Sequence, residues 1–116
     1  GLYYRSVADK MLWIPVNKEV FKSMMRNRVY ENDSLYRFRP AYEDELVHIV
    51  CHCIFDKRET PQKYIDRIKE LIPLIDESKV KYLMNRAFYA ASDKVFDTMK
   101  TAPENLHNAY ISFTEY

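Results

Sequence analysis

The chain has 116 residues, of which 47% are hydrophobic, 15% aromatic and 30% charged, and its formal net charge is +1. This length fits one domain with a core that needs neither disulfides nor metal, and the composition argues against disorder. Gly1 is the only glycine. That excludes dinucleotide-binding, P-loop and nucleophile-elbow motifs, because each needs glycine where the backbone approaches phosphate or turns sharply.

We expect residues 1–116 to form a single helical domain, and the initial Gly in place of Met favours a segment of a larger protein. No apolar run approaches the roughly 20 residues of a membrane-spanning helix, and no signal-peptide pattern opens the chain. Cys51 and Cys53 are too close along a predicted helix to pair easily. These features predict an intracellular protein, cytoplasmic or nuclear, without a membrane partner.

Two helices are predicted in the basic N-terminal third. Apolar residues recur at helical spacing over residues 4–13, and Pro15 stops that run. Asn17 is a suitable N-cap for a second helix that runs to about Tyr30.

Residues 31–40 predict an ordered loop. They are rich in Asn, Asp and Ser, whose side chains compete for backbone hydrogen bonds, and Pro40 restricts Arg39.

A third helix follows, with three acidic residues at 43–45 in its first turn, where the helix dipole favours negative charge. Its apolar side chains recur at the spacing of a buried stripe. The residues expected in this stripe are Tyr42, Leu46, Ile49, Val50 and Cys53.

Residues 41–78 carry nine Asp and Glu against five Lys and Arg, whereas residues 1–40 carry four against eight. The simplest interpretation is electrostatic complementarity between these two parts within the fold.

Thr60 and Pro61 predict the start of a fourth helix that ends or kinks at Pro73. Asp76 is then a suitable cap for a long helix near residues 77–100, which we expect to be the centre of the fold.

A capping box from Thr101 to Glu104 predicts a last short helix, followed by an irregular aromatic tail from Tyr110. Together these patterns predict an all-α fold, a compact single-domain bundle of five to six helices.

The predicted long helix has a second apolar stripe. Tyr82, Tyr89 and Phe96 follow one another at intervals of seven, opposite the face expected to pack in the core. Either other parts of the domain cover this stripe, or it is exposed and binds a partner.

Aromatic residues with a neighbouring arginine are typical of interface centres. The leading hypothesis is therefore a noncatalytic protein–protein interaction domain, an adaptor, scaffold or dimerisation module. Its partner is another protein or a second copy of the chain. The predicted partner-binding residues are Tyr82, Arg86, Tyr89 and Phe96.

The alternative hypothesis is a nucleic-acid-binding module within residues 22–39, because arginines bind phosphates and aromatic rings stack on bases. The candidate residues are Arg26, Arg28, Tyr36, Arg37, Phe38 and Arg39. The near-neutral charge of the whole chain makes this the second choice. A helix-turn-helix around Pro73 is also disfavoured, because Asp76 and Glu77 would repel phosphate.

Glu45, His48 and His52 are spaced so that they share the face of the third helix opposite its apolar stripe. Two histidines four apart could bind zinc, but the further ligands of such a site are missing, so a solvated or hydrogen-bonded face is expected. No base faces Cys51 or Cys53 on the helix, which argues against a nucleophilic thiol. We therefore expect no metal, no cofactor and no enzymatic activity.

Overall fold

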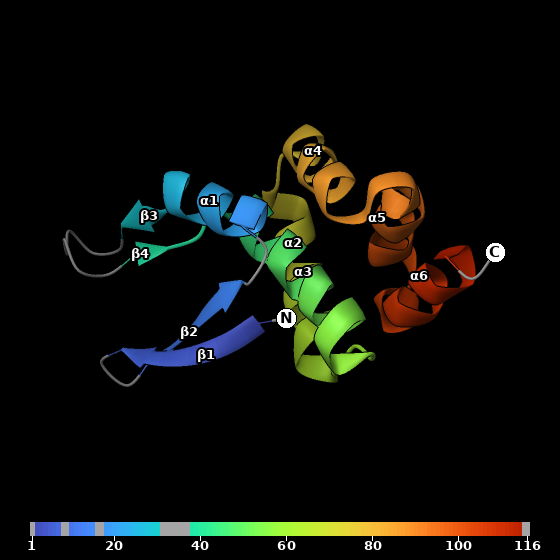
Figure 1. Ribbon diagram of the computed structural model, residues 1–116, viewed down its shortest axis with the longest axis horizontal. Helices are drawn as coiled ribbons and strands as arrows, with labels where there is room; N and C mark the ends of the chain where they lie inside the picture. The colour runs from blue at the N-terminus through green and yellow to red at the C-terminus, as the bar shows by residue number, and fades with distance from the viewer. Residues whose placement is uncertain (1, 8–9, 16–17, 31–37, 115–116) are drawn as a thin grey trace.

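The computed structural model describes residues 2–7, 10–15, 18–30 and 38–114, with side chains for 22–29 and 39–114. Figure 1 shows the N-terminal elements on one side of helix α2 (Tyr42–Cys51) and the C-terminal helices on the other. The molecule is elongated, with principal extents of 47, 26 and 26 Å. The predicted all-α bundle is confirmed by the helices from residue 42 onward, while two short β-ladders precede them.

The chain begins with a β-hairpin, so the helix predicted over residues 4–13 is wrong. Strand β1 (Leu2–Val7) pairs antiparallel with β2 (Lys10–Pro15), in a register from Leu2 opposite Pro15 to Val7 opposite Lys10. The segment is rich in aromatic and β-branched residues, which favour strands, and their spacing also matches one face of a helix.

Helix α1 (Lys18–Arg26) confirms the second predicted helix but ends before Tyr30. The chain then enters β3 (Val29–Tyr30), which pairs with β4 (Phe38–Arg39). The end of the predicted loop is therefore strand. Its residues 31–37 and the proposed cap Asn17 lie outside the described residues.

Helix α2 lies at the centre of the described bundle, a place that we expected the long helix to take. It contacts α1, α3 (Gln62–Leu71) and α4 (Glu77–Phe88), and every residue from 46 to 50 is buried. The predicted acidic first turn and buried stripe are both present. A π-helical turn, η1 (His52–Lys57), extends α2 and ends at Arg58 in the left-handed conformation.

Helix α3 starts one residue later than predicted and is capped differently. Pro61 occupies the N-cap position without a side-chain cap, and its carbonyl accepts hydrogen bonds from the Tyr64 and Ile65 amides at 2.9 and 3.1 Å. The predicted stop at Pro73 is confirmed, because α3 gives way to the 3-10 turn η2 (Ile72–Leu74).

The predicted cap of α4 is also confirmed. The Asp76 carboxylate accepts a hydrogen bond from the Ser78 amide at 3.0 Å, and the Asp76 amide donates to Glu43 of α2 at 3.0 Å.

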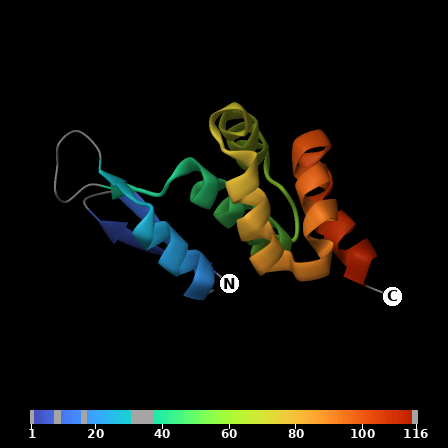
Figure 2. The same cartoon turned by 90° about the horizontal axis from the view of Figure 1, so that it is seen from above.

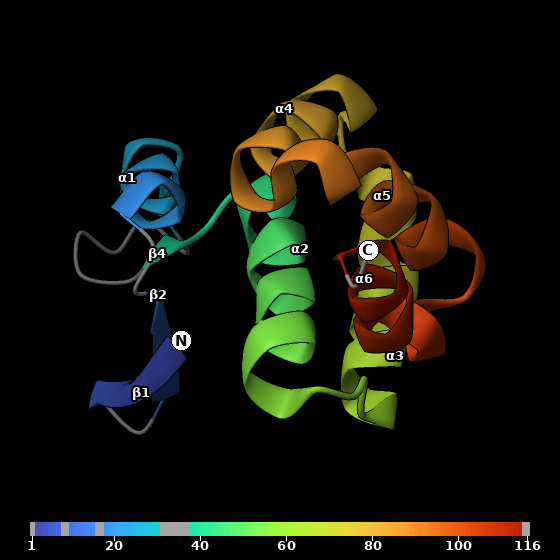
Figure 3. The same ribbon diagram turned by 45° about the vertical axis from the view of Figure 1, so that its right-hand side comes forward.

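The helix predicted over residues 77–100 is broken in the middle. Helix α4 is followed by the 3-10 turn η3 (Tyr89–Ala91) and by α5 (Ser92–Thr101). The break lies at Tyr89, whose φ and ψ are 52° and −122°. Figure 3 shows the change of direction that brings α5 back against α4.

A 3-10 turn, η4 (Pro103–Asn105), leads into α6 (Leu106–Thr114), so the last helix is confirmed. The predicted capping box is wrong, because Thr101 is the last residue of α5 and its hydroxyl donates to the Asp97 carbonyl at 2.8 Å. The tail that we expected to be irregular is helical as far as Thr114.

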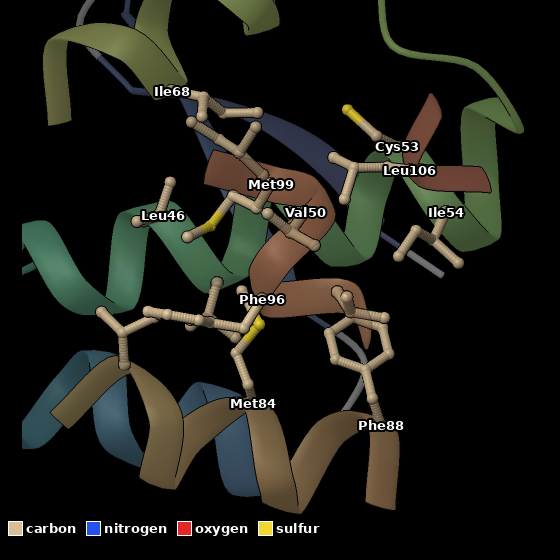
Figure 4. Packing of buried hydrophobic residues seen from close by; sticks show 14 of the residues in the cluster. Leu46, Val50, Cys53, Ile54, Ile68, Met84, Phe88, Phe96, Met99 and Leu106 are labelled. Carbon is tan, nitrogen blue, oxygen red and sulfur yellow. The ribbon is translucent and has the colours of Figure 1, made fainter. Parts of the chain in front are cut away.

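The core lies where α2, α3, α4, α5 and α6 meet, and Figure 4 shows its side chains pointing toward one another. Large side chains that are at most 5% exposed include Leu46, Val50, Ile54, Ile68, Met84, Phe88, Phe96, Met99 and Leu106. Their burial is the main source of stability for this bundle.

Candidate interaction surface on helix α4

Tyr89 is the most exposed large hydrophobic side chain among the described residues, at 75%. It immediately follows Phe88, which is 3% exposed and belongs to the core. The break at Tyr89 therefore directs one ring inward and the next outward.

Tyr82 and Arg86 lie one turn apart on the same exposed side of α4. Tyr82 is 61% exposed, and the Arg86 guanidinium carbon lies 5.7 Å from the centre of its ring. An Arg86 Nη1 also donates a long hydrogen bond of 3.5 Å to the Tyr82 hydroxyl. These contacts restrict the arginine side chain over the tyrosine.

Phe96 does not belong to this surface, so the continuous stripe of Tyr82, Tyr89 and Phe96 is wrong. Because the helix breaks at Tyr89, α5 turns Phe96 inward, where it is 5% exposed. The ammonium groups of Lys81 and Lys100 lie 5.1 and 5.3 Å from the centre of its ring.

These contacts define the two flanks of α4. Lys81 and Glu77 both reach α5, since Lys81 covers Phe96 and Glu77 pairs with Lys100 at 2.7 Å. At about 100° per residue, Lys79, Tyr82 and Arg86 lie on the remaining exposed side of α4. Tyr89 is exposed directly after the end of the helix. We call these four exposed residues the α4 face.

The α4 face is basic as well as aromatic. After Glu77, the sequence of α4 contains Lys79, Lys81 and Arg86 and no acidic residue. Arg86 lies in the last turn, where the helix dipole favours a positive charge.

No protein-family model, curated protein or solved structure matches this chain. Among the described residues, no helix combines the length and the apolar character needed to cross a bilayer.

The residues of the nucleic-acid hypothesis do not form one described surface. Arg26 and Arg28 are exposed at the end of α1, and the Arg28 guanidinium donates to the Met25 carbonyl. Arg39 lies 4.3 Å over the Tyr42 ring. Tyr36, Arg37 and the Phe38 side chain lie outside the described parts of the chain, so this hypothesis stays a prediction.

Helix α1 contacts both α2 and α4. Figure 2 shows α1 with the other N-terminal elements on one side of the helical bundle. Among the described side chains, Ser23 and Asn27 of α1 both donate to the Asp44 carboxylate of α2, Asn27 at 3.3 Å. Asp44 and Ser23 are 2% and 3% exposed.

Charge complementarity at α2 involves a residue that we did not predict. Arg67 of α3 donates two hydrogen bonds to the Glu45 carboxylate, at 2.6 and 2.9 Å. These hydrogen bonds raise the pKa of Arg67. The cation that pairs with Glu45 therefore comes from the middle of the chain, whereas the contacts of Asp44 with the N-terminal third are made by the uncharged side chains of Ser23 and Asn27.

The histidine face, predicted to be solvated or hydrogen-bonded, is hydrogen-bonded at His52 and not solvated, because α2 is covered on this side too. His48 and His52 are 4% and 5% exposed, and Glu45 is engaged by Arg67. The His52 Nδ1 lies 3.0 Å from a carboxylate oxygen of Asp56, and its ring packs edge-on against Tyr64. The described residues contain no cluster of three or more metal-ligating side chains.

Burial decides the protonation of both histidines and both thiols. It lowers the pKa of His48 to about 4 and also lowers the pKa of His52. It raises the pKa of Cys51 to about 12 and that of Cys53 to about 11. At neutral pH the histidines are therefore neutral and the thiols protonated, which makes the thiols poor nucleophiles.

Sequence reasoning missed an aromatic cluster beyond the C-terminal end of α2, at the turn η1. Phe55 of η1 stacks on Phe88 with ring centres 5.7 Å apart, and Tyr110 of α6 packs edge-on against Phe55 at 5.3 Å. Phe55 is 45% exposed. The only sequence signal is that Cys51 and Phe55 continue the helical spacing of α2, and a π-helical turn cannot be read from that spacing.

Proposed function

We propose that this chain is a noncatalytic interaction domain that binds a partner protein through the α4 face. The observation that carries the proposal is Tyr89. Its backbone has a positive φ, which costs a non-glycine residue about 1–3 kcal/mol, and its ring is 75% exposed. A glycine would adopt the same backbone conformation at lower cost, and an exposed ring adds little to the stability of the fold. Binding of a partner would explain why a tyrosine occupies this position.

Tyr82 and Arg86 support the same assignment. Tyrosine and arginine are among the residue types that contribute most to binding energy at interfaces. The contact between the two side chains restricts them before binding, which reduces the entropy that a partner would cost.

The chemistry of the two cysteines supports a noncatalytic, intracellular role. Both thiols are free and are held protonated by burial, so neither supplies a ready nucleophile. Free thiols suit the reducing cytoplasm or nucleus, where we propose that the protein acts.

Site-specific photo-crosslinking in cells that express the protein tests this proposal. A photoreactive amino acid replaces Asn85, an exposed residue of α4 next to the α4 face, so that all four residues of the face stay intact. The matched control replaces Asn108, an exposed asparagine of α6. We expect a protein adduct from position 85 that Arg86→Ala abolishes, and none from position 108. Equal adducts from both positions, or none from position 85, would overturn the proposal.

A further inference from the structure

The occupant of the α4 face can be specified further by its charge. We propose that it is an acidic helical segment of a different protein, an inference that rests on the proposed function. Lys79, Tyr82 and Arg86 follow one another along α4 at intervals of three and four residues, and Tyr89 comes directly after the last residue of the helix.

Intervals of three and four residues are those at which one helix contacts a second helix laid along it, so the spacing of Lys79, Tyr82 and Arg86 matches a helical partner. A partner helix presents side chains to its neighbour once per seven residues on each side of its seam. Acidic residues on one side would meet Lys79 and Arg86, and apolar residues on the other would meet Tyr82 and Tyr89. The α4 face therefore fits an acidic amphipathic helix.

Arg86 is suited to a carboxylate. Its planar guanidinium binds carboxylates through two parallel hydrogen bonds, and the contact with Tyr82 already limits its conformations. Less conformational entropy is lost when such a side chain forms an ion pair.

A second copy of the chain fits the α4 face less well. Two-fold symmetry brings a surface against itself, so Lys79 and Arg86 would meet the same basic residues of the other molecule. Like charges opposed across an interface repel each other, whereas an acidic partner would attract both residues.

A nucleic acid also fits less well. The formal net charge is only +1, and Asp76 and Glu77 lie at the N-terminal end of α4 where they would repel a phosphate backbone. On an acidic helix, carboxylates can be confined to the line that meets Lys79 and Arg86.

The test is a binding titration with designed peptides on the whole chain. The probe is a fluorescein-labelled helical peptide of about 20 residues with one Glu and one Leu in each heptad. A second peptide has Lys in place of each Glu, and a labelled oligothymidylate of similar length represents single-stranded nucleic acid. Fluorescence anisotropy measures each affinity at low and high salt.

We expect the acidic peptide to bind and the basic peptide not to bind. The double variant Lys79→Glu/Arg86→Glu should weaken binding of the acidic peptide by about tenfold or more and should allow the basic peptide to bind. The matched control Lys69→Glu/Lys94→Glu makes the same charge change at exposed positions of α3 and α5 and should leave the affinity within about twofold.

Failure of the acidic peptide to bind, or an equal loss in the control variant, would overturn the inference. So would tighter binding of the oligothymidylate that Lys79→Glu/Arg86→Glu abolishes, since the surface would then bind nucleic acid. A dimeric mass in light scattering that becomes monomeric in that variant would assign the face to a second copy.

The outcome also separates this inference from the proposed function. A protein adduct from position 85 without binding of the acidic peptide would keep the interaction domain and reject the acidic partner. Absence of both would reject the two proposals together.

Discussion

Phe88 and Tyr89 are adjacent in the chain, yet 3% of the Phe88 side chain and 75% of the Tyr89 side chain are exposed. The positive φ of Tyr89 ends α4 at this point and lets α5 fold back beside it. One backbone conformation thereby lets α5 bury Phe96 in the core and leaves Tyr89 on the surface.

Truncation of Phe96 should cost far more stability than truncation of Tyr82. Phe96→Ala should lower the free energy of unfolding by about 3–5 kcal/mol, because it leaves a cavity in the core. Tyr82→Ala should change it by less than about 1 kcal/mol, because that ring is 61% exposed. Urea denaturation of both variants measures the difference. Similar losses in the two would mean that α4 packs differently from this structure.

Stability should fall as the solution is acidified. The pKa of His48 is lowered from its ordinary value of 6.5 to about 4 in the folded protein. As the pH falls, His48 therefore binds a proton in the unfolded chain before it does so in the folded protein. This loss begins near pH 6.5 and is complete below pH 4, where it amounts to about 3 kcal/mol. His48→Leu should flatten the dependence of unfolding free energy on pH over this range. An unchanged slope would show that His48 is not buried in its neutral form.

Helix α1 should depend on Asp44. Asp44→Ala leaves Ser23 and Asn27 without their acceptor and should cost about 2 kcal/mol of stability. Hydrogen exchange should accelerate in α1 before the rest of the bundle. The matched control is Glu45→Ala, which removes a neighbouring carboxylate that pairs with α3. If Glu45→Ala accelerated hydrogen exchange in α1 as strongly as Asp44→Ala does, the hydrogen bonds of Ser23 and Asn27 to Asp44 would not be what holds α1 in place.

Much of the helical bundle could be predicted from the sequence, because its signals are local. The acidic first turn and apolar stripe of α2, the cap at Asp76 and the stop at Pro73 each depend on a few neighbouring residues. The N-terminal hairpin was missed because apolar spacing over residues 4–13 fits a helix as well as a strand pair, so strand propensity is the deciding signal.

The candidate surface was predicted only in part. Tyr82, Arg86 and Tyr89 are exposed, where the sequence left burial and exposure both open, but Phe96 is buried because the helix breaks at a residue that carries no turn signal of its own. The burial of His48 and His52 was also missed, because whether neighbouring elements cover that side of α2 is a tertiary property. Periodicity within one helix does not report it.

The most direct measurement is to compare Tyr89→Gly with the control Arg58→Gly. Both positions have positive φ, so glycine relieves backbone strain at each. Tyr89→Gly should raise the free energy of unfolding by about 1 kcal/mol and, with the photoreactive residue at position 85, abolish the protein adduct. Arg58→Gly should preserve that adduct. A stabilised Tyr89→Gly variant that still forms the adduct at the wild-type level would contradict binding through the α4 face.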